Sequence, residues 1–149
     1  MRFHLIDRID ELEPRVSVRG RKVTSHSEEF WDDSGSDPVM PPPLILEALC
    51  QAGTWLIMAS TELRQRAALL QVGAVRFLGD VRPGDIVELH GEVVSMTDEI
   101  AVLSGRATVE GEVVLEADDI MCALIDAGDL EDVEDSGRML KALTRTGGS

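Results

Sequence analysis

The sequence predicts an α+β domain in which an antiparallel sheet wraps around one long central helix. Residues 44–63 are the only long stretch that is apolar on nearly every face of a helix, which is typical of a buried helix. From there to residue 126, strand-like segments alternate with turn sequences at short intervals, as in antiparallel sheets. A helix and a sheet can bury each other's apolar surfaces, so the two observations predict one layered domain.

The part before the helix predicts one strand and one long loop. Residues 1–25 are interpreted as a short helical or irregular lead-in followed by a strand at 16–23, whose apolar residues have strand-like spacing. Residues 26–43 have no period and combine an Asp/Ser/Gly cluster at 32–37 with four prolines. They predict a loop that runs into the helix start, where proline is tolerated.

The part after the helix predicts four strands and a tail. The strands are expected at 69–78, 86–95, 100–110 and 113–125, with turns at 82–85 and at Gly111, and we expect them to form an antiparallel meander. Residues 126–149 contain an acidic cluster and end in Thr-Gly-Gly-Ser, which predicts a short helix at most and then a disordered end. The predicted division is a domain at 1–125 and a partly disordered acidic tail at 126–149.

Composition excludes several functions. The chain has 149 residues, a formal net charge of −14 and only 3% aromatic residues, which argues against nucleic acids and anionic membranes as partners. The apolar run at 44–59 is interrupted by Glu47, Gln51 and Gly53, so it is interpreted as too short and too polar to span a bilayer. The N-terminus has no signal-like apolar segment, and the two cysteines are expected to be buried free thiols, so we expect a cytoplasmic protein. Neither a metal nor a cofactor is predicted, because metal-ligand spacing and Gly-rich phosphate loops are missing from the sequence.

Three sequence blocks carry a resemblance to a known family. The first block is Met-Arg-Phe-His-Leu-Ile-Asp-Arg-Ile at residues 1–9. The second is Pro-Val-Met-Pro at 38–41, followed by Leu-Ile-Leu-Glu-Ala-Leu at 44–49 and by Gln51. The third is Val-Arg-Phe at 75–77, followed by Val-Arg-Pro-Gly-Asp at 81–85. With them the chain resembles the bacterial FabZ-type β-hydroxyacyl-[acyl-carrier-protein] dehydratases over residues 1 to about 125. The resemblance implies a hotdog fold, a dimer with two active sites across its interface, and an acyl thioester as ligand.

The resemblance also identifies site positions, and two of them are altered. Glu47 stands where the family has its catalytic carboxylate. Asp33 stands where the family has histidine in Gly-His-Phe-Pro-Gly, and Pro42 replaces the glycine whose N–H would stabilise the enolate-like oxygen. Glu47 and Asp33 are therefore the candidate catalytic residues, with His26 as the alternative partner of Glu47. A solvated acidic loop remains the plain interpretation of Asp33. The candidate substrate-binding residues are Val39, Met40, Pro42 and Phe77.

Three functions remain open at this point. The first is a FabZ-like protein of fatty-acid or acyl-thioester metabolism that lacks normal dehydratase activity and acts as an acyl-binding or partner subunit. The second is an active dehydratase or other acyl-thioester enzyme that uses Glu47 with Asp33 or His26, because fold alone does not fix activity. The third is a structural dimer without an acyl ligand. The expected partners are an acyl group on acyl carrier protein or coenzyme A and a second copy in a homodimer or higher even oligomer. A heterodimer with a catalytic relative is a further possibility.

Overall fold

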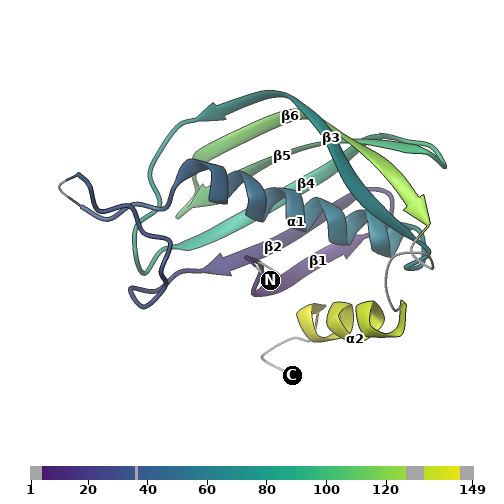
Figure 1. Cartoon of the computed structure of the whole chain (residues 1–149), viewed down its shortest axis with the longest axis horizontal. Coiled ribbons are helices and arrows are strands. Elements are labelled where there is room, and N and C mark those ends of the chain that lie inside the picture. The colour runs from purple at the N-terminus through teal and green to yellow at the C-terminus, as the bar shows by residue number, and fades with distance from the viewer. Residues whose placement is uncertain (1–4, 36, 127–132, 145–149) are drawn as a thin grey trace.

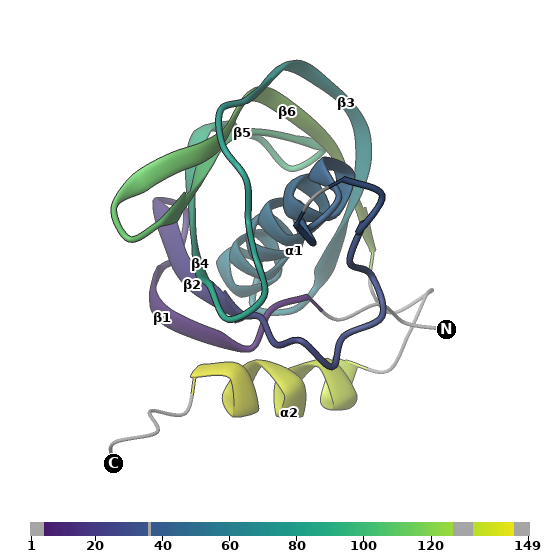
Figure 2. The same cartoon turned by 90° about the vertical axis from the view of Figure 1, so that its left-hand side faces the viewer.

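In a computed structural model of the chain, one curled antiparallel sheet surrounds helix α1 (Figures 1 and 2). The structure describes residues 5–35, 37–126 and 133–144. Within that part of the chain the elements are β1 (Arg8–Glu13), β2 (Ser17–Val23), α1 (Pro42–Ser60), β3 (Gln65–Phe77), β4 (Ile86–Met96), β5 (Ile100–Val109), β6 (Glu112–Asp126) and α2 (Val133–Thr144). The predicted α+β architecture, with an antiparallel sheet around one long helix, is confirmed.

The strand order corrects the predicted meander. The six strands lie in the order β1-β2-β4-β5-β6-β3, and every pair is antiparallel. The prediction holds for β4, β5 and β6, but β3 pairs with β6 at the edge of the sheet and not with β4. The reason is α1, which ends directly before β3 and lies across the sheet, so the chain reaches the far edge before it returns at β4.

The lead-in prediction was wrong for residues 8–13, which form strand β1. β1 pairs with β2, and the register shifts between Ile9 and Glu11. This bulge separates the two inward apolar residues, Ile9 and Leu12, by three positions, so the sequence has helix-like spacing where the backbone is extended. The charged side chains between them suit a strand at the edge of a sheet.

Helix α1 packs closely against the inner face of the sheet. Its buried residues are Ile45, Ala48, Leu49, Ala52, Gly53, Leu56, Ile57 and Met58. Small residues opposite allow the approach: a Cβ at Gly105 of β5 would lie 2.9 Å from Leu49 Cδ1 and 2.6 Å from the His90 carbonyl oxygen. The helix ends at Ser60 instead of Leu63, because Glu62 and Leu63 have left-handed φ angles of 54° and 65°.

The length and composition of α1 would allow it to cross a membrane, which corrects the prediction that this stretch is too short and too polar. An 18-residue window of this 19-residue helix has a mean hydropathy of 1.3, and half of that window is buried inside the fold. A core helix passes the same test, because a helix that packs against a sheet is also long and apolar.

The C-terminal region contributes α2, which lies along edge strand β1 (Figure 2). Leu143 is buried there, and Met139 and Leu140 are partly buried against the core. The predicted short helix in the tail is thus observed, whereas the predicted disordered end lies outside the described residues.

Candidate functional site

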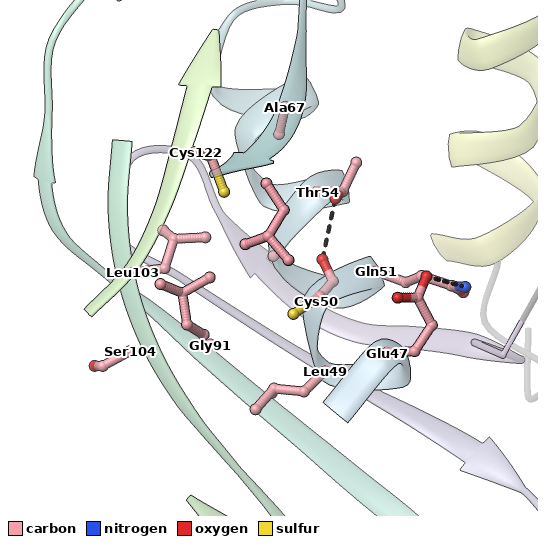
Figure 3. Close-up of a pocket in the computed structure, with 13 residues that line it drawn as sticks. Glu47, Leu49, Cys50, Gln51, Thr54, Ala67, Gly91, Leu103, Ser104 and Cys122 are labelled. Carbon is pink, nitrogen blue, oxygen red and sulfur yellow. Dashed lines mark hydrogen bonds between the residues drawn. The ribbon is translucent and has the colours of Figure 1, made fainter. Parts of the chain in front are cut away.

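A cavity of about 200 Å³ opens between α1 and the sheet (Figure 3). Helix α1 lines it with Glu47, Leu49, Cys50, Gln51, Gly53 and Thr54, and the sheet lines it with Ala67, Leu69, Gly91, Leu103, Ser104, Ile120 and Cys122. Among these residues Glu47 is the only carboxylate, and there is no lysine or arginine. The cavity therefore suits an uncharged, mostly apolar ligand.

Glu47 is placed at the rim of this cavity by the helical repeat. Glu47, Cys50, Gln51 and Thr54 have the spacing i, i+3, i+4 and i+7, which brings them to one side of α1. Glu47 is exposed in the single chain. In Figure 3 its carboxylate extends toward Gln51, while the Cys50 sulfur points to the side of Leu103 and Gly91.

Gln51 holds the Glu47 carboxylate in a defined orientation. The backbone N–H of Leu5 donates to Gln51 Oε1 over 2.8 Å, and Gln51 Nε2 donates to Glu47 Oε1 over 3.3 Å. Because the Leu5 N–H needs an acceptor, it fixes which end of the Gln51 amide faces Glu47. The N-terminal segment is thereby connected to the rim of the cavity.

Two free thiols line the apolar part of the cavity. Cys50 is half-buried and Cys122 is buried. Burial raises the pKa of Cys50 to about 11, with further contributions from the neighbouring Glu47 and Cys122, and burial also raises the pKa of Cys122. Both sulfurs are protonated at neutral pH, so they act as apolar wall atoms and not as nucleophiles.

The start of α1 offers no free backbone N–H. Pro41, Pro42 and Pro43 follow one another, and proline has no N–H to donate. The next N–H, that of Leu44, donates to the Pro41 carbonyl over 2.9 Å, and the N–H before the prolines, that of Met40, donates to the Val81 carbonyl over 2.8 Å. A negatively charged oxygen at this helix start would find no donor in the backbone.

Asp33 lies in an exposed loop and does not line the cavity. A bridge between Asp32 and Val39 closes this loop, with N–O distances of 2.9 and 3.0 Å. The Asp32 carboxylate accepts from the Ser34 hydroxyl and backbone N–H, and these hydrogen bonds lower the pKa of Asp32. The local geometry is that of an Asx-type turn in a solvated loop.

The other candidates are also apart from the cavity in one chain. His26 is exposed in a turn, Pro42 and Phe77 are exposed, and Val39 is half-buried. Met40 is 2% exposed and belongs to the core. Of the residues selected from the sequence, the cavity contains Glu47 alone. Among the described residues no group of three His, Cys, Asp or Glu side chains could hold a metal ion.

Sequence reasoning missed most of the cavity. Gln51 could have been found as a functional partner, because it lies one helical turn after Glu47. The sheet residues Leu103 and Cys122 could not, because their approach to α1 depends on strand pairing between distant segments.

Comparisons with known proteins agree with the fold. The FabA-like domain matches residues 1–118. The 3-hydroxyacyl-[acyl-carrier-protein] dehydratase FabZ of Bacillus licheniformis is 39% identical over 118 residues, which cover 78% of this chain and 82% of that protein. Among solved structures, smu.793 from Streptococcus mutans UA159 bound to acetyl CoA has a TM-score of 0.65 at 16% identity, covering 85% of this chain and 91% of that one. The dehydratase heterocomplex ApeI:P from Xenorhabdus doucetiae has a TM-score of 0.62 at 12% identity and covers 91% and 88%.

Proposed function

Because this chain belongs to the FabZ-type, FabA-like family of hotdog-fold acyl-thioester proteins, we propose that it binds an acyl thioester beside Glu47 without normal dehydratase activity. In this proposal it serves as an acyl-binding or partner subunit. The observation that carries the proposal is the start of α1, where three consecutive prolines leave no N–H for an oxyanion.

The chemistry of dehydration explains why this change matters. Removing the proton next to a thioester carbonyl places negative charge on the carbonyl oxygen, and a fixed donor must stabilise that charge. A second group must move protons to and from the β-hydroxyl. Imidazole does this near neutral pH, whereas the carboxylate of Asp33 is a weaker base. Two separate requirements are therefore unmet at the family's positions.

The exposed edge of β3 supports a dimer as the working unit. Within residues 5–35, 37–126 and 133–144, β3 pairs only with β6, and its exposed residues include Leu69, Leu70 and Phe77, each more than half exposed. An open apolar edge is a surface on which a second chain can pair. The other edge, β1, has α2 beside it. In such a dimer the 32–39 loop and Phe77 of a second chain would approach Glu47, which is how Asp33, Val39 and Phe77 would enter the site.

The second subunit could also be a different chain. The ApeI:P structure, whose fold this chain shares, is described as a dehydratase heterocomplex. We propose the homodimer or a higher even oligomer for the isolated protein and a heterodimer with a catalytic relative as the functional alternative. The carrier of the acyl group is coenzyme A or acyl carrier protein. A cytoplasmic location stays a prediction.

One observation favours an active acyl-thioester enzyme as the second candidate. Gln51 orients the Glu47 carboxylate at the rim of an apolar cavity, which is where a general base would be needed. The candidate catalytic partners of Glu47, Asp33 and His26, do not line that cavity in one chain. The active enzyme is therefore the second candidate.

An activity assay on the wild type and on variants with the family's histidine and glycine restored tests the proposal. We expect no measurable hydration of a crotonyl thioester by the wild-type chain, because loss of an oxyanion donor typically costs ~10²–10³ in rate and loss of a general base ~10²–10⁴. Asp33→His alone should recover little, and Asp33→His with Pro42→Gly should recover more. Native mass spectrometry of the same samples should still detect bound crotonyl thioester in the wild type. Robust wild-type turnover that Glu47→Gln abolishes would refute the proposal in favour of the second candidate.

A further inference from the structure

We propose that helix α2 orients the Glu47 carboxylate from outside the cavity, with Leu143 as the positioning residue; the effect on ligand binding rests on the proposed acyl-binding function. Leu143 holds the N-terminal segment, residues 5–7, against α1, and this segment reaches Glu47 through Gln51. α2 lies beyond residues 1–118, which match the FabA-like domain, so the family match assigns it no role.

One face of α2 is apolar and packs on the core. Among its described side chains, Leu143 is 9% exposed, and Met139 and Leu140 are partly buried against the core. Their spacing along the helix brings these three side chains to one face. Ala142 and Thr144, on either side of Leu143, are exposed. The attachment of α2 to the domain is therefore a small apolar contact in which Leu143 is the most buried member.

The N-terminal segment lies between this face of α2 and helix α1 (Figures 1 and 2). Among the described elements, β1 is the main contact of α2, and α1 contacts β1 as well. Leu5 and Ile6 of the segment and Ile9 of β1 are buried in the same apolar cluster as Leu143. The packing of α2 thus presses the segment and the start of β1 toward α1.

The first residue of the segment depends on this packing more than the last one does. The Asp7 N–H donates to the Arg21 carbonyl over 2.9 Å, and the pairing of β1 with β2 follows directly. Leu5 precedes these backbone hydrogen bonds, and its N–H donates to the Gln51 side chain over 2.8 Å. A side-chain acceptor can rotate, so the position of Leu5 relies on the apolar side chains around it, Leu143 among them.

A displaced Leu5 would release the Glu47 carboxylate. Gln51 Nε2 donates to Glu47 Oε1 over 3.3 Å while Gln51 Oε1 accepts from Leu5. Without the Leu5 N–H, neither end of the Gln51 amide is held toward Glu47, whose side chain is exposed at the rim of the cavity. A ligand that contacts Glu47 would then have to order this side chain on binding, which lowers its affinity.

A purely structural role for α2 makes a different prediction. A helix beside an edge strand can serve only to cover that edge. Loss of the Leu143 contact would then lower the stability of the fold, or free β1 as a whole, without a selective effect on Leu5 and Gln51. The two roles are therefore distinguished by what happens at Leu5 and Gln51 while Asp7 stays in place.

Amide hydrogen exchange measured by NMR on the full-length chain, without ligand, tests the positioning role. In Leu143→Asp, whose carboxylate cannot stay in the apolar cluster, the Leu5 amide should exchange ~10-fold faster or more. The side-chain NH₂ signals of Gln51 should shift in the same variant. The Asp7 amide should keep its protection, because its bond to the Arg21 carbonyl remains.

Two further variants serve as controls. Ala142→Asp is the matched control, because it adds the same charge at the neighbouring, exposed position of α2 and should leave Leu5 and Gln51 unchanged. Leu143→Met keeps an apolar side chain of similar size and should retain wild-type exchange at Leu5. If Leu143→Asp does not fold, Leu143→Ala is the milder variant and should change Leu5 and Gln51 in the same direction.

Binding of crotonyl-pantetheine, measured by calorimetry, tests the consequence for the site. Leu143→Asp should weaken binding several-fold, and Ala142→Asp should not. Unchanged Leu5 exchange in folded Leu143→Asp, or equal loss of protection at Leu5 and Asp7, would overturn the inference and leave acyl binding intact. Wild-type affinity in a variant whose Leu5 is released would overturn it as well. A wild type that binds no thioester would refute the proposed function, whereas the Leu5 and Gln51 signals would still decide whether α2 orients Glu47.

Discussion

At the scale of single residues, two hydrogen bonds at the candidate site join Leu5 to Gln51 and Gln51 to Glu47. A buried or half-buried backbone N–H needs an acceptor, and the Gln51 side chain supplies it for Leu5. The same amide then presents its NH₂ group to Glu47. Gln51 thus serves both the fold and the site. Substitutions that keep or remove its acceptor oxygen can separate these two roles.

We predict that Gln51→Ala destabilises the fold by about 1–3 kcal/mol, because the Leu5 N–H loses its acceptor. Gln51→Glu keeps an acceptor oxygen but places a second carboxyl beside Glu47, which raises the pKa of one carboxyl of the pair. A raised carboxyl pKa makes the folded state bind a proton more tightly, so stability falls as pH rises above about 4. Urea unfolding at pH 4 and pH 7.5 should show that the free energy of unfolding of Gln51→Glu is close to that of the wild type only at pH 4. Equal stability of Gln51→Ala and wild type would contradict the assigned role of Gln51.

At the scale of elements, the sequence predicted those features that depend on local pattern. The all-round apolarity of 44–63 identified α1, and turn signals identified β4, β5 and β6 within a few residues. β1 was missed because its bulge spaces Ile9 and Leu12 like helix residues. The pairing of β3 with β6 was missed because no local pattern records which distant strand becomes a neighbour. The cavity lining depends on that pairing, so only its helical half could have been predicted.

The outer face of the sheet places His90 between two arginines on neighbouring strands. Arg19 of β2 and Arg106 of β5 are its cross-strand partners, and Glu92 lies 3.0 Å from His90 Nε2. Partial burial and, secondarily, the Arg106 charge lower the pKa of His90, while Glu92 opposes the shift. The unfolded chain then binds a proton more readily than the folded one as pH falls below the ordinary histidine pKa of 6.5.

We therefore predict that the wild-type melting temperature falls between pH 6.5 and pH 5, before most carboxylates titrate. His90→Gln should flatten this part of the stability curve, because it removes the group that titrates. His26→Gln is the control, since His26 is exposed in a turn. Melting curves at half-unit pH intervals would measure the slopes, and identical slopes for wild type and His90→Gln would show that His90 does not cause the dependence.

At the scale of the whole molecule, the two edges of the sheet differ in a way that determines how copies can associate. β1 has charged side chains and α2 alongside, whereas β3 has a long row of exposed residues that includes Leu69 and Leu70. A formal net charge of −14 opposes close approach of two chains, so association needs a localised apolar surface. The β3 edge provides such a surface and also lies next to the outer side of the cavity.

A charge on that edge should dissociate the proposed dimer. We predict that the wild-type chain has the mass of a dimer by light scattering at micromolar concentration, and that Leu70→Lys shifts it toward the monomer. The lysine would have to be desolvated against the partner strand, and a charged edge strand resists pairing. Val94→Lys is the matched control: Val94 is 62% exposed, more than Leu70 at 56%, but lies on β4 inside the sheet order. Circular dichroism should show both variants folded. A monomeric wild type, or equal dissociation by Val94→Lys, would contradict pairing through β3, and the 32–39 loop of a second chain would then have no route to Glu47 along this edge.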